Sequence, residues 1–194
     1  MKLSKIKGAL KGKRICIVTE AGGNQWLGDG SAFYLMDSGL DLTKGNVLAI
    51  LDIDEERRGD YTVTEPDVAR LPMLDMCPQE ECDKLLTPLV SVSWAGELIT
   101  ILKTEDGEAV AVSQKRIAPA DGKEPLGFFL RRSVDEETGE IKAPVVAAFR
   151  DMLCCAVTVP VRRQVMDEIW RLMRIASAES LAYCEEEKHD NNID

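Results

Sequence analysis

The sequence predicts an α+β fold: a mostly antiparallel β-sheet built from hairpins, with a long C-terminal amphipathic helix and a short basic N-terminal helix. Short β-forming runs separated by turn residues recur between residues 14 and 159. Apolar side chains then return at helical spacing from about Arg162 to Cys184. The chain has 194 residues, of which 45% are hydrophobic and 30% charged, a size and composition typical of one globular domain.

The first residues predict a short amphipathic helix. Leu3, Ile6 and Leu10 have the spacing of one helical face, so a helix is expected over residues 2–10, ending at Gly12. All the charged side chains of this segment are basic. We therefore treat residues 1–13 as a basic N-terminal helix or arm.

Alternation of apolar and polar residues between turn residues predicts the strands. In the first half of the chain these are residues 14–19, 25–27, 31–36, 46–53 and 61–64. Four prolines make residues 65–88 the main irregular stretch. The later strands are residues 89–94, 97–103, 108–112, 128–133, 140–146, 145–149 and 152–159, paired as hairpins across short turns.

The last element is the helix from 162 to 184, whose apolar stripe includes Val165, Ile169 and Leu172. An acidic tail, residues 185–194, follows it and is expected to be disordered. Residues 14–184 thus form the predicted single α+β domain. A broad apolar helix face suggests a homodimer or a protein partner as its covering surface.

Charge and cysteine content limit the possible environments. The net charge is −10, six cysteines are present, and no apolar run reaches the length of a membrane span. We expect a cytoplasmic protein with reduced thiols and no membrane association. The basic N-terminus is nevertheless a candidate nucleic-acid contact, with solvated surface charge as the alternative; its members are Lys5, Lys7, Lys11, Lys13 and Arg14.

The common catalytic patterns are missing, so we predict no catalytic residue, no metal and no cofactor. The one histidine, His189, lies in the acidic tail, where a catalytic base would be poorly held. Glycines near Lys13 are too closely spaced for a phosphate-binding loop, and the acids at 52–56 lack the glycine of a calcium loop. The cysteines fit buried side chains better than zinc ligands; the four concerned are Cys77, Cys82, Cys154 and Cys155.

One enzymatic alternative stays open. Asp121 precedes Glu140 and Lys142, an arrangement that metal-dependent nucleases use to hold Mg²⁺ and assist the attacking water. Ordinary cross-strand charge pairing explains the same residues.

Aromatic residues beside glycines suggest recognition instead. Trp and Tyr combine apolar area with a polar tip, which suits binding surfaces, although packing of a hairpin core explains them equally. The candidate binding residues are Gln25, Trp26, Gly30, Tyr34 and Trp94.

The segment from Lys13 to Met36 resembles the opening of uncharacterised phage or prophage proteins of Gram-positive gut anaerobes. The shared pattern is Gln-Trp-x-x-x-Gly-x-x-x-Tyr, here Gln25, Trp26, Gly30 and Tyr34. This resemblance implies a mobile-element context and no particular activity. The strand ending near residues 157–161 is similar to sliding-clamp domains, by analogy alone.

Together these features favour a non-enzymatic interaction or accessory protein, possibly encoded by a phage or mobile element. The alternatives are a clamp-like nucleic-acid accessory protein that uses the basic arm, and a metal-dependent nuclease.

Overall fold

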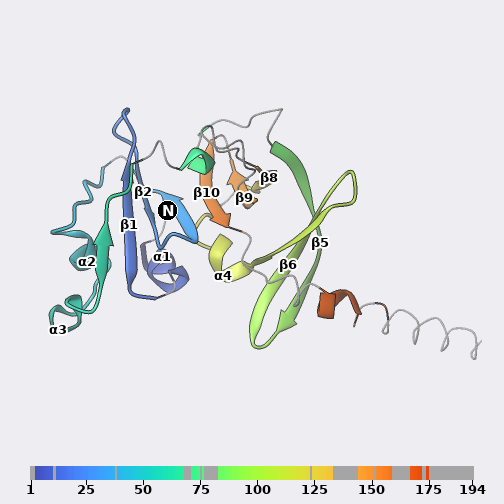
Figure 1. Ribbon diagram of the computed structural model, residues 1–194, viewed down its shortest axis with the longest axis horizontal. Helices are drawn as coiled ribbons and strands as arrows, with labels where there is room; N and C mark the ends of the chain where they lie inside the picture. Colours follow the sequence, from blue (N-terminus) through green and yellow to red (C-terminus); the bar gives the residue numbers. More distant parts are fainter. Residues whose placement is uncertain are drawn as a thin grey trace, which may run out of the picture. The chain divides into compact units, whose positions relative to one another are not determined.

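A ten-stranded sheet organises the N-terminal part of the chain (Figure 1). The computed structural model describes residues 3–10, 12–37, 39–67, 71–74, 76, 83–122, 124–132, 144–150, 152–158, 167–171 and 174. The chain divides into two compact units, Met1–Pro160 and Val161–Asp194. All the strands that the structure describes belong to the first unit.

The strands follow the order β4-β1-β2-β3-β10-β9-β8-β5-β6-β7 across the sheet. β1 and β4 pair in parallel, and the other described pairings are antiparallel. The strand bounds are β1 (Arg14–Thr19), β2 (Gln25–Gly28), β3 (Ala32–Leu35), β4 (Thr62–Thr64), β5 (Asp83–Trp94), β6 (Glu97–Thr104), β7 (Ala109–Ser113), β8 (Gly127–Arg131), β9 (Val145–Phe149) and β10 (Leu153–Thr158).

The helices of the first unit are short. The longest that the structure describes is the N-terminal one, with seven residues. They are α1 (Leu3–Ala9), α2 (Val47–Ile50), α3 (Glu55–Arg58), α4 (Gln114–Ile117) and a 3₁₀ turn, η2 (Pro72–Leu74).

Hydrophobic clusters lie on both faces of the sheet. Along β1, Ile15 and Ile17 enter one cluster, whereas Cys16 and Val18 enter the other. This alternation follows from the period of two along a strand. The first cluster also takes in Ile6, which is fully buried, so α1 is part of the core rather than a loose arm.

The predicted fold class needs correction, although α+β content holds broadly. The sheet is mixed. The prediction of a long C-terminal amphipathic helix was wrong, because among the described residues beyond Pro160 helix is limited to 167–171 and 174. An apolar stripe stabilises a helix only through the surface on which it packs, and the sequence pattern does not supply that surface.

Two local predictions also fail. Residues 47–50 form the helix α2 and not a strand, because a short apolar run does not distinguish the two. Strand β5 begins at Asp83, inside the stretch that the prolines made irregular. It accommodates Pro88 beside a register shift between Pro88 and Val90, which is where a sheet tolerates proline.

The β9–β10 hairpin is confirmed, with Arg150 in its turn. The predicted hairpin of residues 128–133 and 140–146 holds in part: β8 pairs with β9, where Leu130 faces Val146 and Arg131 faces Val145, while residues 140–143 lie outside the described residues. The loop predicted at residues 135–139 lies outside the described residues.

Candidate functional site

The aromatic hairpin of β2 and β3 is core structure. Trp26 and Tyr34 are both fully buried. The Trp26 indole Nε1 donates a hydrogen bond to Glu20 Oε1 at 2.6 Å, and the Tyr34 hydroxyl donates to the Arg116 carbonyl at 2.9 Å. Their polar tips are thus satisfied inside the protein, and a partner at the surface cannot reach them.

The neighbouring polar and glycine positions also serve the fold. The Gln25 amide donates to the Leu42 carbonyl at 2.9 Å and accepts from the Leu42 N–H at 2.7 Å, like a strand neighbour. Gly30 has a φ of +85°, which closes the turn between β2 and β3. Trp94 is half-buried at the end of β5, beside the turn at residues 95–96.

The basic N-terminal side chains make contacts within the chain. Lys5 donates to the Ala118 carbonyl at 3.2 Å, Lys7 to the Asp52 carbonyl at 2.5 Å, and Lys13 to Asp60 at 2.7 Å. Arg14 is exposed at the start of β1, and Lys11 lies outside the described residues. These contacts leave less basic surface for a phosphate backbone than the sequence suggests.

Two arginine–aspartate pairs are buried, and sequence reasoning missed both. Arg116 Nη1 lies 2.7 Å from Asp29, and Arg131 binds both oxygens of Asp83 at 2.8 and 2.7 Å. In each pair both side chains are at most 3% exposed. A buried ion pair has a structural role unless a substrate can reach it. Both of these pairs are closed to a substrate by their burial, so we assign them a structural role.

Neither the Tyr34 hydroxyl nor the Cys155 thiol is activated as a nucleophile. Burial is the main cause that raises the pKa of the Tyr34 hydroxyl well above its usual value, and the nearby Cys155 is the second cause. Burial is also the main cause that raises the pKa of the Cys155 thiol, and the neighbouring Cys154 is the second cause. Both groups therefore stay protonated at neutral pH, whereas a nucleophile needs the opposite shift.

The possible metal sites of the sequence do not come together in the described part of the chain. No group of three or more His, Cys, Asp or Glu side chains there could hold a metal ion. Cys77, Cys82, Glu140 and Lys142 fall outside the described residues, as does His189. Likewise, no described helix has the length and apolar character needed to cross a membrane.

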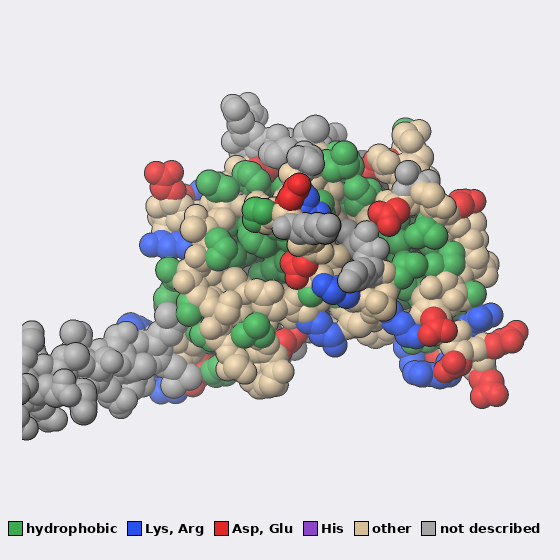
Figure 2. Space-filling view, turned by 180° about the vertical axis from the view of Figure 1, so that it is seen from behind, with side chains coloured by type: hydrophobic (Ala, Val, Ile, Leu, Met, Phe, Trp, Pro, Cys, Tyr) green, Lys and Arg blue, Asp and Glu red, His purple; other side chains and the backbone are tan. Residues whose placement is uncertain are grey.

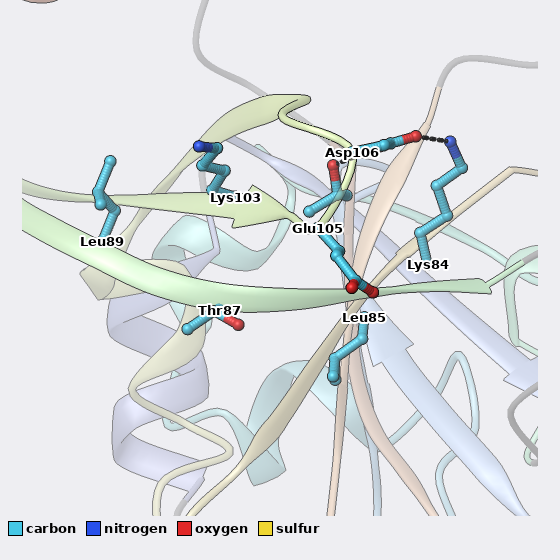
Figure 3. A pocket seen from close by; sticks show the side chains of 8 residues that line it. Lys84, Leu85, Thr87, Leu89, Lys103, Glu105 and Asp106 are labelled. Carbon is cyan, nitrogen blue, oxygen red and sulfur yellow. Dashed lines mark hydrogen bonds and ion pairs between the residues drawn. The ribbon is translucent and has the colours of Figure 1, made fainter.

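An open groove of about 790 Å³ lies along the hairpin of β5 and β6. Figure 3 shows its lining: Lys84, Leu85, Thr87 and Leu89 come from β5, and Lys103, Glu105 and Asp106 from β6 and the turn after it. Leu85 is 62% and Leu89 52% exposed, so two large aliphatic side chains of this strand face solvent. Sequence analysis did not identify this groove because its β5 residues lie at the edge of the proline-rich stretch.

Charged groups flank these leucines. Lys84 Nζ lies 2.5 Å from the Asp106 carboxylate, and Thr104 Oγ1 donates to the other oxygen of the same group (Figure 3). The bond from Lys84 and that from Thr104 lower the pKa of Asp106 to about 2. The lining of the groove therefore combines apolar side chains with a fixed carboxylate and two lysines, which suits binding rather than proton transfer.

No protein-family model, curated protein or solved structure matches this chain. The resemblance to phage proteins and the clamp analogy therefore remain predictions.

Proposed function

We propose that the protein is a non-enzymatic accessory protein that binds a protein partner through the β5–β6 hairpin. The observation that supports this most directly is the exposure of three leucines on one hairpin. Leu85, Leu89 and Leu98 are 62%, 52% and 49% exposed. Large exposed apolar side chains cost free energy in water, which partner binding recovers.

The chemistry around the leucines supports a protein partner. Lys84, Lys103 and Glu105 line the groove together with the leucines, and protein interfaces likewise combine charged and apolar side chains. Seen from the opposite side to Figure 1, hydrophobic side chains reach the surface in patches bordered by acidic and basic ones (Figure 2).

The backbone of β5 adds a second means of binding. Only Asp83–Leu86 pair with β8, whereas pairing with β6 continues to Trp94. Among the described strands, the far part of β5 thus has a neighbour on one side alone. An extended segment of a partner can hydrogen-bond there, although Pro88 removes one donor.

We propose a cytoplasmic location and an origin in a phage or other mobile element as part of the same function. The thiols of Cys16, Cys154 and Cys155 are free, which fits a reducing compartment.

Photo-cross-linking in cells tests the proposal. A benzoylphenylalanine placed at position 85 or 98 should give a discrete cross-linked product, identifiable by mass spectrometry as another protein or a second copy. The same group at Asp52, whose side chain is fully exposed, is the control. The proposal would be contradicted if no cross-linked product formed from position 85 or 98, or if the same product formed from position 52.

A double variant provides the second arm. Leu85→Ser with Leu89→Ser should abolish the product formed from position 98 while leaving the unfolding transition almost unchanged, because both side chains are exposed. Persistence of the product would show that the leucines do not carry the binding.

A further inference from the structure

The far part of β5, which forms a long hairpin with β6 (Figure 1), has an edge that is bounded at both ends. Pairing with β8 stops at Leu86, and Pro88, close beyond it, has no N–H to donate. At the other end the chain turns at residues 95–96 into β6. Among the described strands, none therefore lies beside residues 89–94 on the side away from β6.

The hairpin turn determines which backbone groups point to this edge. Its two residues, 95 and 96, have φ angles of +49° and +78°, as in a type I′ turn. Trp94, which precedes the turn, is then hydrogen-bonded to β6, and hydrogen-bonded positions alternate along an antiparallel pair. The N–H and C=O groups of Val92 thus point to β6, whereas those of Ser91 and Ser93 point to the unpaired edge.

This edge carries no charge. Residues 89–94 are one leucine, two valines, two serines and one tryptophan. Edge strands are usually protected from pairing by lysine or another charged residue. Although the chain has a net charge of −10, two copies that meet at this edge bring no like charges into direct contact.

The side chains of the edge are arranged symmetrically about Val92. Val90, Val92 and Trp94 lie on one face of the strand and are half-buried, whereas Ser91 and Ser93 lie on the other face and are exposed. A two-fold axis at Val92 would place Ser91 opposite Ser93 of the partner subunit, and Val90 opposite Trp94 of the partner subunit. Both serine pairs would then exchange N–H···O=C bonds, and the apolar side chains would cover one another.

We propose that the protein forms a two-fold symmetric homodimer in which residues 90–94 of β5 pair antiparallel with the same residues of a second copy. This inference rests on the proposed function, because it names the partner of the same hairpin. The length of the edge favours a second copy: a partner strand must end near Pro88, and in this register the turn at residues 95–96 of the second copy ends it there. Trp94, a candidate binding residue of the sequence, lies within the interface.

Sedimentation equilibrium of the full-length protein tests the association. We expect a concentration-dependent equilibrium between one chain and two. A single chain at every concentration up to that used for NMR would overturn the inference. Assemblies that keep growing beyond two chains would also overturn it, because a two-fold contact closes on itself.

A charge swap at Val92 tests the position of the axis. Val92→Lys and Val92→Glu each bring two like charges together, so each variant should dimerise at least about tenfold more weakly than the unaltered protein. An equal mixture of the two variants should recover dimers, which a merely misfolded variant could not do. Thr62→Lys, exposed on the opposite edge strand β4, is the control and should dimerise normally. Undiminished dimerisation of both Val92 variants, or no recovery on mixing, would overturn the register.

Cysteine cross-linking checks the same register. Val92 and its copy form a non-hydrogen-bonded pair, whose Cα atoms lie about 4.5 Å apart, within reach of a disulfide. Val92→Cys should therefore give a covalent dimer on oxidation, in excess of that from the unaltered protein, and Thr62→Cys should not. Equal yields from the two variants would contradict the proposed pairing.

These outcomes separate the inference from the proposed function. A chain that stays monomeric but cross-links to a different protein from position 85 or 98 would overturn the homodimer and leave the proposed function standing. A dimer with the Val92 behaviour described, without any product from positions 85 and 98 in cells, would support the pairing of β5 and contradict binding through the leucines.

Discussion

At the scale of single residues, buried charge explains much of the interior. The Asp29 carboxylate accepts hydrogen bonds from the backbone N–H groups of Ser31 and Ala32 and also pairs with Arg116. One acid therefore holds the β2–β3 turn and anchors α4. The sequence could not predict this, because arginine and aspartate are usually exposed and their partner is 87 residues away.

Asp29→Ala should destabilise the fold by about 3–5 kcal/mol, because it leaves the Arg116 charge buried without a partner. Urea unfolding measures the effect. Asp60→Ala is the matched control: Asp60 also lies 2.7 Å from a cation, Lys13, but both side chains are exposed, so little change is expected. Equal losses in the two variants would contradict a role for burial.

The Asp106 carboxyl should titrate in the folded protein with a pKa of about 2, and Lys84→Gln should raise that pKa toward the ordinary value, about 3.9. Because the pKa is lowered on folding, the stabilisation is present above the unfolded value and is lost as the pH falls through the folded one. Carbon-detected NMR gives both pKa values. Lys103→Gln should leave the Asp106 pKa unchanged, since Lys103 lines the groove without a bond to Asp106.

At the scale of elements, the sequence predicted several strands and the hairpin pairing of β9 with β10, but not the pairings between strands that are distant in the chain. β1, β2 and β3 lie close to their expected ranges because their apolar side chains sit between turn residues. α2 was mistaken for a strand because four apolar residues fit either conformation. The start of β5, which holds Leu85, was missed because residues 65–88 contain four prolines, whereas Leu89 was placed in a strand without any sign that its side chain is exposed.

Close packing within the β2–β3 hairpin makes Gly28 irreplaceable. A Cβ at this position would lie 2.3 Å from the Ala32 carbonyl oxygen and 2.6 Å from Phe33 Cδ1. Gly28→Ala should therefore destabilise the protein by about 1–3 kcal/mol or more, measured by thermal and urea unfolding. Gly59→Ala has no atom within 4 Å and a φ of −61°, so it should be nearly neutral. A neutral result at Gly28 would contradict the hairpin packing.

At the scale of the whole first unit, β10 joins two parts of the sheet. It pairs with β3 through Cys155 and Tyr34 and with β9 through Ala156 and Ala147. Sequence analysis identified the β9–β10 hairpin, whose strands are close in the chain. The pairing with β3 spans more than a hundred residues, and no local pattern specifies it.

Ala156→Asp should therefore weaken both parts of the sheet together. Ala156 is 1% exposed, so the change buries an unpaired charge in the joining strand. Hydrogen exchange should accelerate in β2 and β3 as well as in β8 and β9. Ala109→Asp, half-buried on the edge strand β7, should affect mainly β6 and β7. Exchange that changes on one side of β10 alone would contradict its joining role.

The position of β10 also has a consequence for synthesis on the ribosome. Strands β1–β4 and β5–β9 are complete before Leu153 is made, yet neither β3 nor β9 has its shared neighbour until then. The nascent chain must therefore carry the unpaired edge of β3 for as long as it takes to translate residues 36–152, whereas β9 waits only for the turn that follows it. A chaperone or rapid elongation through residues 36–158 would shorten the period in which these edges can pair with another chain.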